Sequence, residues 1–382
     1  MSPTPVTYAS PTQPASYSWE ATDDEVAARY GVPRESIVRF DLNTSPEPPG
    51  LAADLLARGR FETSLSEYPP SDYRRLVDAA AAAYGVAADE ILVGAGADEI
   101  LDLVGKAFLP PGGEAVVPVP SYAMYRVVTE QRGARVVAVA RRSATAGWAI
   151  EVAAVQEAAR RANVVWLCSP NNPTGLSEPP GSIEALLEGI GRDAAKDGRE
   201  PAIVVLDEAY SEFVDRSLVA LRLANPNLVL VRTASKAYAL AGLRVGFAVA
   251  APATIARIAP YRPPGSVSTV SVTIVTEALL EPTAMRANVA RIRTERERLG
   301  AALTQAGWRV GPSETNFLLV AFDDPAEAAA IAESLLRSGL VPRTFGAGHP
   351  LAAFLRLTVR STTENDRLIA AASAGGLPRV ER

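Results

Sequence analysis

The chain contains one cysteine and one histidine in 382 residues, Cys168 and His349. A lone cysteine excludes a disulfide within the chain, and the pair offers no His/Cys cluster for a metal ion. No run of about 18 uncharged apolar residues occurs, so we expect no membrane-spanning helix. Long basic runs are also missing and the net charge is -5, which argues against nucleic acid as the main partner.

The remaining composition is that of an ordinary globular protein, with 48% hydrophobic and 21% charged residues. The N-terminus lacks a charged region followed by an apolar core, so it does not read as a secretory signal. A chain of this length is too long for one small core and fits two lobes. We therefore expect a cytoplasmic protein with two domains.

Short, apolar, β-branched segments recur along the first two thirds of the chain. Such segments are typical of buried strands in a mostly parallel sheet, and helical patterns separate several of them. This alternation predicts an α/β fold whose ligands gather at the carboxyl ends of the strands. The predicted strands cover residues 91–93, 114–117, 135–139, 164–168, 203–206, 228–231 and 245–250, and the predicted helices 73–84, 100–108, 152–160, 183–196 and 253–258.

The pattern changes at both ends of this region. Residues 1–18 are rich in Ser, Thr and Pro and predict a flexible arm. Residues 19–60 carry a capped helix at 22–30 and a strand at 37–42, and we expect them to join a smaller domain. That small α/β domain spans residues 265–382, with helices at 267–280, 282–306 and 325–338 and strands at 317–322 and 354–359. The large domain then covers residues 61–264.

One lysine, Lys236, lies in an apolar stretch between two predicted strands, residues 231–247. Besides Arg244, the only other charge in this stretch is Arg232. Burying an ammonium group is costly, so the pKa of Lys236 should fall toward that of a nucleophilic free amine. A lysine whose head group reaches solvent from a loop is the alternative explanation.

A second local signal follows the strand at 91–93. The turn Gly94-Ala-Gly-Ala-Asp-Glu99 leads into a helix, and a small-residue turn at a helix N-terminus can bind an anion through free backbone N–H groups. A purely structural turn is the alternative. The turn is not GxGxxG and opens no βαβ dinucleotide unit, which argues against NAD.

Four segments together carry the functional signal: Ser169-Pro-Asn-Asn-Pro-Thr-Gly175, Asp207-Glu-Ala-Tyr210, Ser235-Lys236 and Arg244. Asn172, Asp207, Lys236 and Arg244 are separated by 35, 29 and 8 residues. With Tyr68-Pro-Pro-Ser-Asp-Tyr, Pro120-Ser-Tyr-Ala-Met-Tyr125 and Leu355-Arg-Leu-Thr-Val359, this order resembles the fold-type I class I/II aminotransferases, and within them the histidinol-phosphate aminotransferases. The resemblance covers most of the chain and implies a large mostly parallel sheet domain with a smaller α/β domain.

The resemblance also implies a cofactor, pyridoxal 5′-phosphate, and a role for each matching residue. Lys236 would bind the cofactor's aldehyde carbon and then carry a proton as a base. Asp207 would keep the pyridine nitrogen protonated, and Tyr210 and Asn172 would hydrogen-bond the 3′ oxygen. The other implied cofactor contacts are the ring stacking of Tyr122 and the phosphate binding of Gly96, Ala97, Asp98, Ser235 and Arg244.

The implied substrate groups lie elsewhere in the sequence. Tyr68 resembles a residue that reaches the phosphate of the neighbouring subunit, which implies a homodimer with shared active sites. Arg356 and Arg343 would bind acidic groups of the substrate, and Asn172 would also face it. Taken singly, each of these residues also has a plain structural explanation, in a turn, in the core or on the surface. The order of the motifs carries the interpretation.

One position departs from the subgroup. Where Leu-Asn-Glu-Asn-Pro-Tyr is usual, this chain has Leu42-Asn-Thr-Ser-Pro-Glu47. A carboxylate in place of a phosphate-binding phenol would repel a phosphorylated substrate and suit a cationic or hydroxyl group. An exposed loop charge that never meets substrate is the alternative for Glu47.

These signals predict a pyridoxal-phosphate aminotransferase that moves an amino group between an amino donor and a 2-oxo acid, with 2-oxoglutarate as the expected acceptor. Histidinol phosphate leads as donor by resemblance. The rivals are a transaminase or oxidase for a cationic or aromatic amino acid and a decarboxylase of the threonine-phosphate type. A cofactor-sensing regulator ranks low, because the first 70 residues show no helix-turn-helix pattern.

Overall fold

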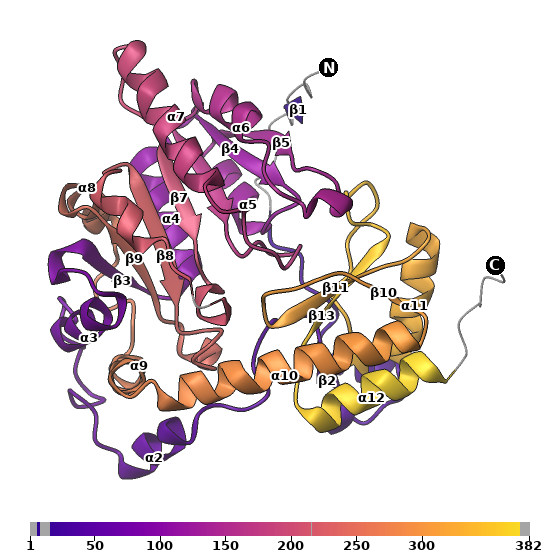
Figure 1. Cartoon of the computed structure of the whole chain (residues 1–382). Coiled ribbons are helices and arrows are strands. Elements are labelled where there is room, and N and C mark those ends of the chain that lie inside the picture. Colours follow the sequence, from indigo (N-terminus) through magenta and orange to yellow (C-terminus); the bar gives the residue numbers. More distant parts are fainter. Residues whose placement is uncertain (1–5, 8–15, 215, 375–382) are drawn as a thin grey trace. The chain divides into compact units, whose positions relative to one another are not determined.

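The computed structural model describes residues 6–7, 16–214 and 216–374 (Figure 1). The chain divides into two compact units, which we describe separately. The first unit comprises Met1–Tyr17, Pro48–Asn172 and Leu176–Arg286, and the second comprises Ser18–Glu47, Pro173–Gly175 and Ala287–Arg382. The division into residues 1–18, 19–60, 61–264 and 265–382 remains a proposal from sequence. Most of the predicted flexible arm lies outside the described residues.

The first unit is built on an eight-stranded sheet with the order β1-β5-β4-β6-β7-β8-β9-β3. Strands β5, β4, β6, β7 and β8 are mutually parallel, whereas β9 runs antiparallel to both β8 and β3. The strands are β1 (Val6–Thr7), β3 (Ile91–Gly94), β4 (Glu114–Val119), β5 (Arg135–Ala140), β6 (Val164–Cys168), β7 (Ile203–Asp207), β8 (Leu228–Thr233) and β9 (Gly246–Ala250).

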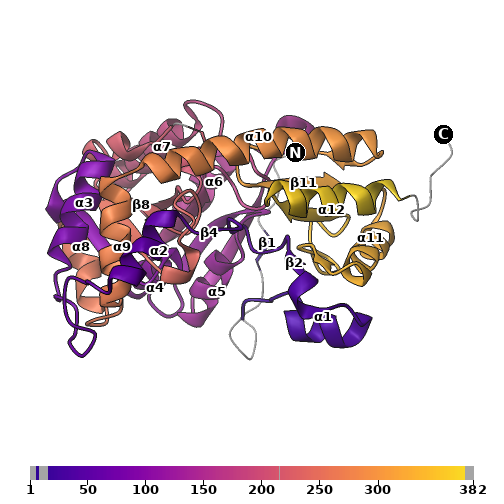
Figure 2. The ribbon, with the colours of Figure 1, turned by 90° about the horizontal axis from the view of Figure 1, so that it is seen from below.

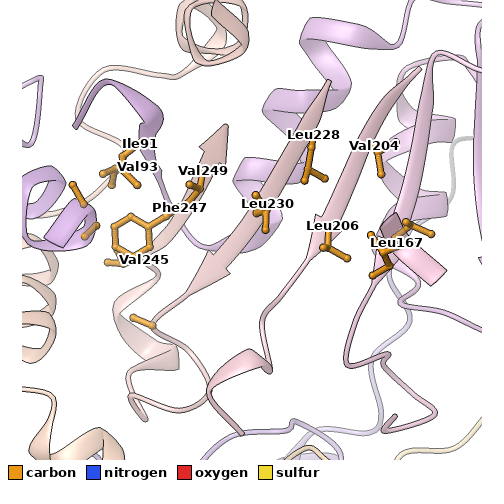
Figure 3. Packing of buried hydrophobic residues seen from close by; sticks show 14 of the residues in the cluster. Ile91, Val93, Leu167, Val204, Leu206, Leu228, Leu230, Val245, Phe247 and Val249 are labelled. Carbon is orange, nitrogen blue, oxygen red and sulfur yellow. The ribbon is translucent and has the colours of Figure 1, made fainter. Parts of the chain in front are cut away.

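Apolar side chains cover both faces of this sheet, because its central strands are buried along their whole length. Figure 3 shows one face, where side chains of β3, β9, β8, β7 and β6 form a continuous layer. Helices α3 (Arg74–Tyr84), α6 (Val152–Ala159), α7 (Ser182–Lys196) and α9 (Thr269–Leu280) pack against it. Helices α4 (Ala97–Phe108), α5 (Met124–Gln131) and α8 (Pro252–Ile258) pack on the other face. The unit is a three-layer α/β/α structure, with α2 (Gly50–Arg58) against α9.

The second unit has its own core around a three-stranded antiparallel sheet, β10-β11-β13. Helices α10 and α12 lie side by side in both views (Figures 1 and 2), joined by the ion pair between Arg298 and Asp366. The elements are α1 (Asp23–Tyr30), β2 (Val38–Arg39), α10 (Thr283–Gln305), β10 (Arg309–Val310), β11 (Phe317–Ala321), α11 (Pro325–Arg337), β12 (Leu340–Val341), β13 (Phe354–Thr358) and α12 (Thr362–Ser373). The first turn of α10 counts with the first unit.

The predicted α/β fold is confirmed, and most strands agree within two residues. The capped helix also forms, because Thr22 and Glu25 make a reciprocal capping box. Three local details differ. The strand predicted at 37–42 shrinks to β2, α4 starts at Ala97 rather than at residue 100, and the helices α2, α5 and α12 had not been predicted. In α4, Gly96 adopts a left-handed φ of 88° and places the helix start directly after it.

Two negative findings concern the described residues alone. None of their helices is long and apolar enough to cross a membrane. Among the same residues, no group of three or more His, Cys, Asp or Glu side chains is arranged to hold a metal ion.

Candidate active site

Strand register brings the sequence motifs to one edge of the large sheet. Asp207 at the end of β7 pairs with Cys168 of β6 and with Val231 of β8. On the other side of β8, Thr233 pairs with Gly246 of β9, and Gly246 pairs with Gly94 at the end of β3. The carboxyl ends of β6, β7, β8 and β3 therefore meet at this edge, where open α/β sheets bind ligands.

Two glycines shape the turn between β3 and α4. A Cβ atom on Gly246 would overlap the backbone of Gly96 and Ala97, and a Cβ on Gly96 would overlap the guanidinium of Arg244. Only glycine lets these backbones approach so closely, and only glycine accepts the φ of 88° at Gly96 without strain. The N-terminus of α4, with its unsatisfied backbone N–H groups, therefore lies next to a guanidinium. This combination forms an anion-binding cradle.

Side chains close the cradle on two sides. Arg244 sits in a left-handed conformation (φ 53°, ψ 63°), and its Nη2 lies 3.3 Å from Oδ2 of Asp98. Tyr122 donates a hydrogen bond of 3.0 Å from its hydroxyl to Oδ1 of the same carboxylate. Ser235 is buried, and its Oγ accepts a hydrogen bond of 2.9 Å from Thr233. Asp98 thus links the aromatic ring of Tyr122 to the guanidinium of Arg244.

Lys236 follows β8 and is half-buried, with its Nζ 5.8 Å from the centre of the Tyr210 ring. Tyr210 itself is buried three residues beyond Asp207, and Asn172 is buried after β6. The same edge of the sheet thus holds the amine of Lys236, the phenol of Tyr210 and the carboxamide of Asn172, which follow three different strands. The amine is the one nucleophile among them.

Asp207 is a buried carboxylate held by two donors. Its Oδ2 accepts a hydrogen bond of 2.8 Å from the hydroxyl of Tyr125, and its Oδ1 accepts one of 3.0 Å from the backbone N–H of Ala209. Burial raises the pKa of Asp207 to about 6, although both hydrogen bonds oppose the shift. Burial also raises the pKa of the neighbouring Cys168 to about 12, so that thiol stays neutral.

Arg232, the other charge in the lysine stretch, has a structural role. Its guanidinium pairs with Glu208 and Glu212 at 2.8 Å each and stacks over the ring of Tyr84 at 4.8 Å. These carboxylates raise its pKa against the effect of burial. A buried charge with two opposite partners needs no ligand.

The basic substrate residues predicted from the sequence belong to the second unit. Arg343 and Arg356 are neighbours, since their backbones exchange two hydrogen bonds of 3.0 Å. Arg356 is only 6% exposed, lies over the ring of Phe317 at 5.3 Å and donates to the carbonyl of Asp41. Arg343 donates to the carbonyl of Ser18 at 2.7 Å and lies 3.5 Å from the carboxylate of Glu20.

Two further candidates are solvent-exposed in the single chain. Glu47 is exposed in the second unit. Burial lowers the pKa of Arg291, and the charges of Glu295 and Glu47 oppose this shift. Tyr68 is 91% exposed in the first unit. The fold therefore gathers the candidates for cofactor binding except Tyr68, and it gathers the two arginines separately.

Sequence reasoning missed Tyr125 as a partner of Asp207. The tyrosine was visible in the segment Pro120-Ser-Tyr-Ala-Met-Tyr125, but its helix α5 had not been predicted. A helix start at Met124 would have turned Tyr125 toward the sheet. That is the signal from which its contact could have been found.

Comparison with known proteins places this chain in a family. The family model described as "Aminotransferase class I and II" matches residues 53–372. The chain belongs to the class I and II aminotransferase family.

Individual relatives show which members of the family the chain resembles. The chain is 36% identical to a histidinol-phosphate aminotransferase from Symbiobacterium thermophilum over 88% of its length and 90% of the relative. It is 40% identical to a histidinol-phosphate aminotransferase from Xylella fastidiosa, over 80% of this chain and 83% of the relative. Among solved structures, histidinol-phosphate aminotransferase from Sinorhizobium meliloti in complex with pyridoxal-5′-phosphate superimposes with a TM-score of 0.82 at 24% identity, covering 93% of this chain and 94% of that one. The last likeness concerns the fold.

Enzymes of this family work with pyridoxal phosphate, and the residues at the sheet edge fit that group. The cradle of Gly96, the α4 N-terminus and Arg244 suits a phosphate dianion. The amine of Lys236 suits an aldehyde. The buried carboxylate of Asp207 suits a protonated ring nitrogen. The enzyme is a pyridoxal-phosphate-dependent transaminase.

Proposed function

We propose that this aminotransferase takes the amino group of histidinol phosphate and passes it to a 2-oxo acid, with 2-oxoglutarate as the acceptor. We infer the donor from the likeness to histidinol-phosphate aminotransferases over most of the chain. The adjacent guanidinium-bearing residues Arg343 and Arg356 support it, because both substrates carry acidic groups that arginine binds through paired hydrogen bonds.

Each residue at the sheet edge has a proposed task. Bound pyridoxal phosphate supplies an electron sink for the electron pair released at the substrate's Cα. Lys236 holds the aldehyde carbon and, once displaced by the substrate, moves the proton at Cα. Asp207 holds the proton on the ring nitrogen. Tyr210 and Asn172 orient the ring through its 3′ oxygen.

The remaining residues hold the cofactor in place. The phosphate is bound by the backbone N–H groups of Ala97 and Asp98 after Gly96, together with Ser235 and Arg244. Tyr122, whose hydroxyl donates to Asp98, would stack on the cofactor ring.

We also propose a homodimer in which Tyr68 reaches the phosphate of the neighbouring subunit. The exposure of Tyr68 and of the nearby Leu65 in the single chain supports this assembly, because large apolar side chains in one exposed segment often mark an interface. The molecular mass of the protein in solution tests it. A cytoplasmic location remains a prediction from sequence.

The donor is tested by a screen in which purified enzyme is mixed with one amino compound at a time. Conversion of bound cofactor to its pyridoxamine form is followed by absorbance, and 2-oxoglutarate is then added to reverse it. Histidinol phosphate is expected to convert the cofactor fastest among histidinol phosphate, aromatic amino acids and arginine. Faster conversion by arginine would favour a cationic donor, and release of carbon dioxide from threonine phosphate would favour the decarboxylase.

Glu47 is the residue that favours a cationic donor, and its replacement measures its effect. Glu47→Tyr is expected to raise kcat/KM for histidinol phosphate about fivefold, because a like charge near the phosphate costs on the order of 1 kcal/mol. Glu47→Gln is the matched control that removes the charge without adding a phenol. Unchanged kinetics in both variants would make Glu47 a surface charge outside the substrate site.

Arg244 is expected to contribute through the phosphate alone. Arg244→Ala should weaken the affinity for pyridoxal phosphate about thirtyfold, since a hydrogen bond between charged groups is lost. Affinity for pyridoxal, which lacks the phosphate, should stay within about twofold. Both are measured by fluorescence titration of the apoenzyme. Arg257→Ala, which removes an exposed arginine paired with Glu200, is the control. Equal loss for both ligands would place Arg244 outside the phosphate site.

A further inference from the structure

Tyr125 is a buried tyrosine that has no role in the function proposed above. It lies in the first turn of α5, and its hydroxyl donates the 2.8 Å hydrogen bond to Oδ2 of Asp207. Both residues are buried, so water does not compete for this contact. A hydrogen bond to a charged group in such surroundings is stronger than one between neutral groups.

The orientation of the Tyr125 ring is fixed from several sides. It stacks on Trp166 of β6 with 5.8 Å between ring centres and an angle of 4° between planes, and Tyr122 meets its edge at 5.7 Å. Thr129 joins the two stacked residues, because its hydroxyl donates to the carbonyl of Tyr125 at 2.7 Å and accepts from the indole N–H of Trp166 at 3.0 Å. The hydroxyl of Tyr125 is thus aimed at Asp207 by packing against Trp166 and Tyr122 and by the hydrogen bond from Thr129.

The charges around Asp207 show what this hydrogen bond opposes. Burial raises the pKa of Asp207, and the charge of Asp98 adds to the rise. The hydrogen bond from Tyr125 is the largest effect in the other direction, ahead of the backbone N–H of Ala209 and the charge of Lys236. Burial and the nearby carboxylate raise the pKa of Tyr125 well above its usual value, so the phenol keeps its proton and acts as the donor.

We propose that Tyr125 is a positioning residue that acts through Asp207: its hydroxyl keeps the carboxylate ionised and oriented, so that the ring nitrogen of bound pyridoxal phosphate retains its proton. This inference rests on the proposed function of Asp207. Without the phenol, the carboxylate becomes a stronger base than it is in the wild type. The single proton between Asp207 and the nitrogen then moves toward the oxygen, and no further proton is gained or lost.

The position of that proton is measured directly by nitrogen-15 NMR of holoenzyme reconstituted with cofactor labelled at the ring nitrogen. Wild type is expected to give a pyridinium chemical shift, and Asp207→Asn provides the neutral-ring reference. Tyr125→Phe is expected to move the resonance from the wild-type value toward that reference. Tyr84→Phe, which removes another buried tyrosine hydroxyl from the same unit, is the matched control and should leave the resonance unchanged.

Kinetics supply a second readout. Tyr125→Phe is expected to lower kcat about tenfold, while KM for the donor changes less than about twofold, because the phenol does not touch the substrate. If Tyr125→Phe fails to fold, replacement of Tyr125 by 3-fluorotyrosine keeps the shape and strengthens the donor. It is then expected to move the resonance further to the pyridinium side with kcat retained, and an unchanged resonance or a shift toward the neutral-ring reference would overturn the proposal.

The possible outcomes distinguish the role of Tyr125 from that of Asp207. A pyridinium resonance in wild type that stays in place in Tyr125→Phe would overturn the role of Tyr125 and leave that of Asp207 intact. A neutral ring in wild type would overturn the assignment of Asp207 itself. A loss of kcat in Tyr125→Phe without a change in the resonance would reduce Tyr125 to a packing residue.

Discussion

Replacement of Lys236 by alanine is expected to lower kcat by about ten-thousandfold, because the variant loses the base that we propose to move the proton at Cα. It also loses the amine that holds the cofactor's aldehyde carbon. The purified wild type should be yellow and should keep its cofactor after borohydride reduction and denaturation. Lys236→Ala should release it under the same treatment. Absorbance and intact-mass spectrometry of the reduced protein measure this difference.

The composition of the chain makes this test unusually clean. Only three lysines occur, at positions 106, 196 and 236. Lys106 is paired with Asp102 on the outside of α4 at 2.7 Å, and Lys196 ends α7. Lys106→Ala and Lys196→Ala are therefore matched controls that should keep both activity and the reducible linkage. A reducible adduct at either of these positions in Lys236→Ala would refute the assignment of Lys236.

Replacement of Asp207 by alanine is expected to lower kcat about a thousandfold, because the ring nitrogen loses the carboxylate that keeps it protonated. Cofactor methylated at the ring nitrogen carries a permanent positive charge and should restore part of the activity of Asp207→Ala, without helping wild type. Asp207→Asn keeps the shape of the side chain and separates charge from packing. Equal activity of Asp207→Asn and wild type would contradict the proposed role.

The raised pKa of Asp207 should also make the stability of the apoenzyme depend on pH. Since the folded pKa of about 6 lies above the ordinary value for aspartate, ionisation of Asp207 destabilises the apoenzyme relative to the unfolded chain. This cost is absent below the unfolded value near pH 4 and is complete above about pH 6. Apo Asp207→Asn is therefore expected to melt higher than apo wild type at pH 8, with the difference shrinking toward pH 4. Calorimetry of the two apoenzymes checks the sign.

The sequence predicted the parts of the fold that follow from local pattern. The central strands are continuous runs of Val, Ile and Leu, and such runs are buried wherever they pair, so their positions agree with the structure. The antiparallel direction of β9 has no local signal, because a run such as Gly246-Phe-Ala-Val-Ala250 reads the same in either direction. The helix α5 was missed because it is short, with only 8 residues, of which four are buried.

The candidate site divides in the same way. Asp207 was proposed because it follows a predicted strand at the carboxyl edge of the sheet, which is a general binding position, and Lys236 because it is a charge in an apolar stretch between two predicted strands. The contact between Gly246 and the turn at Gly96 joins segments 150 residues apart in sequence, so no local pattern reveals it. The pairing of Arg343 with Glu20 likewise depends on a fold contact across the second unit.

The antiparallel direction of β9 affects the order in which the site forms during folding. Because β8 and β9 are antiparallel neighbours, Lys236 and Arg244 lie in one connection of residues 234–245 and need only this strand pair to come together. Asp207 and Asn172 instead depend on parallel pairing between strands separated by whole helices. Contacts between residues close in sequence form faster than those between distant ones. Lys236 and Arg244 therefore belong to a fast-forming part of the chain. The turn after Gly96, which completes the proposed phosphate site, and Asp207, the proposed partner of the ring nitrogen, depend on slower contacts between distant segments.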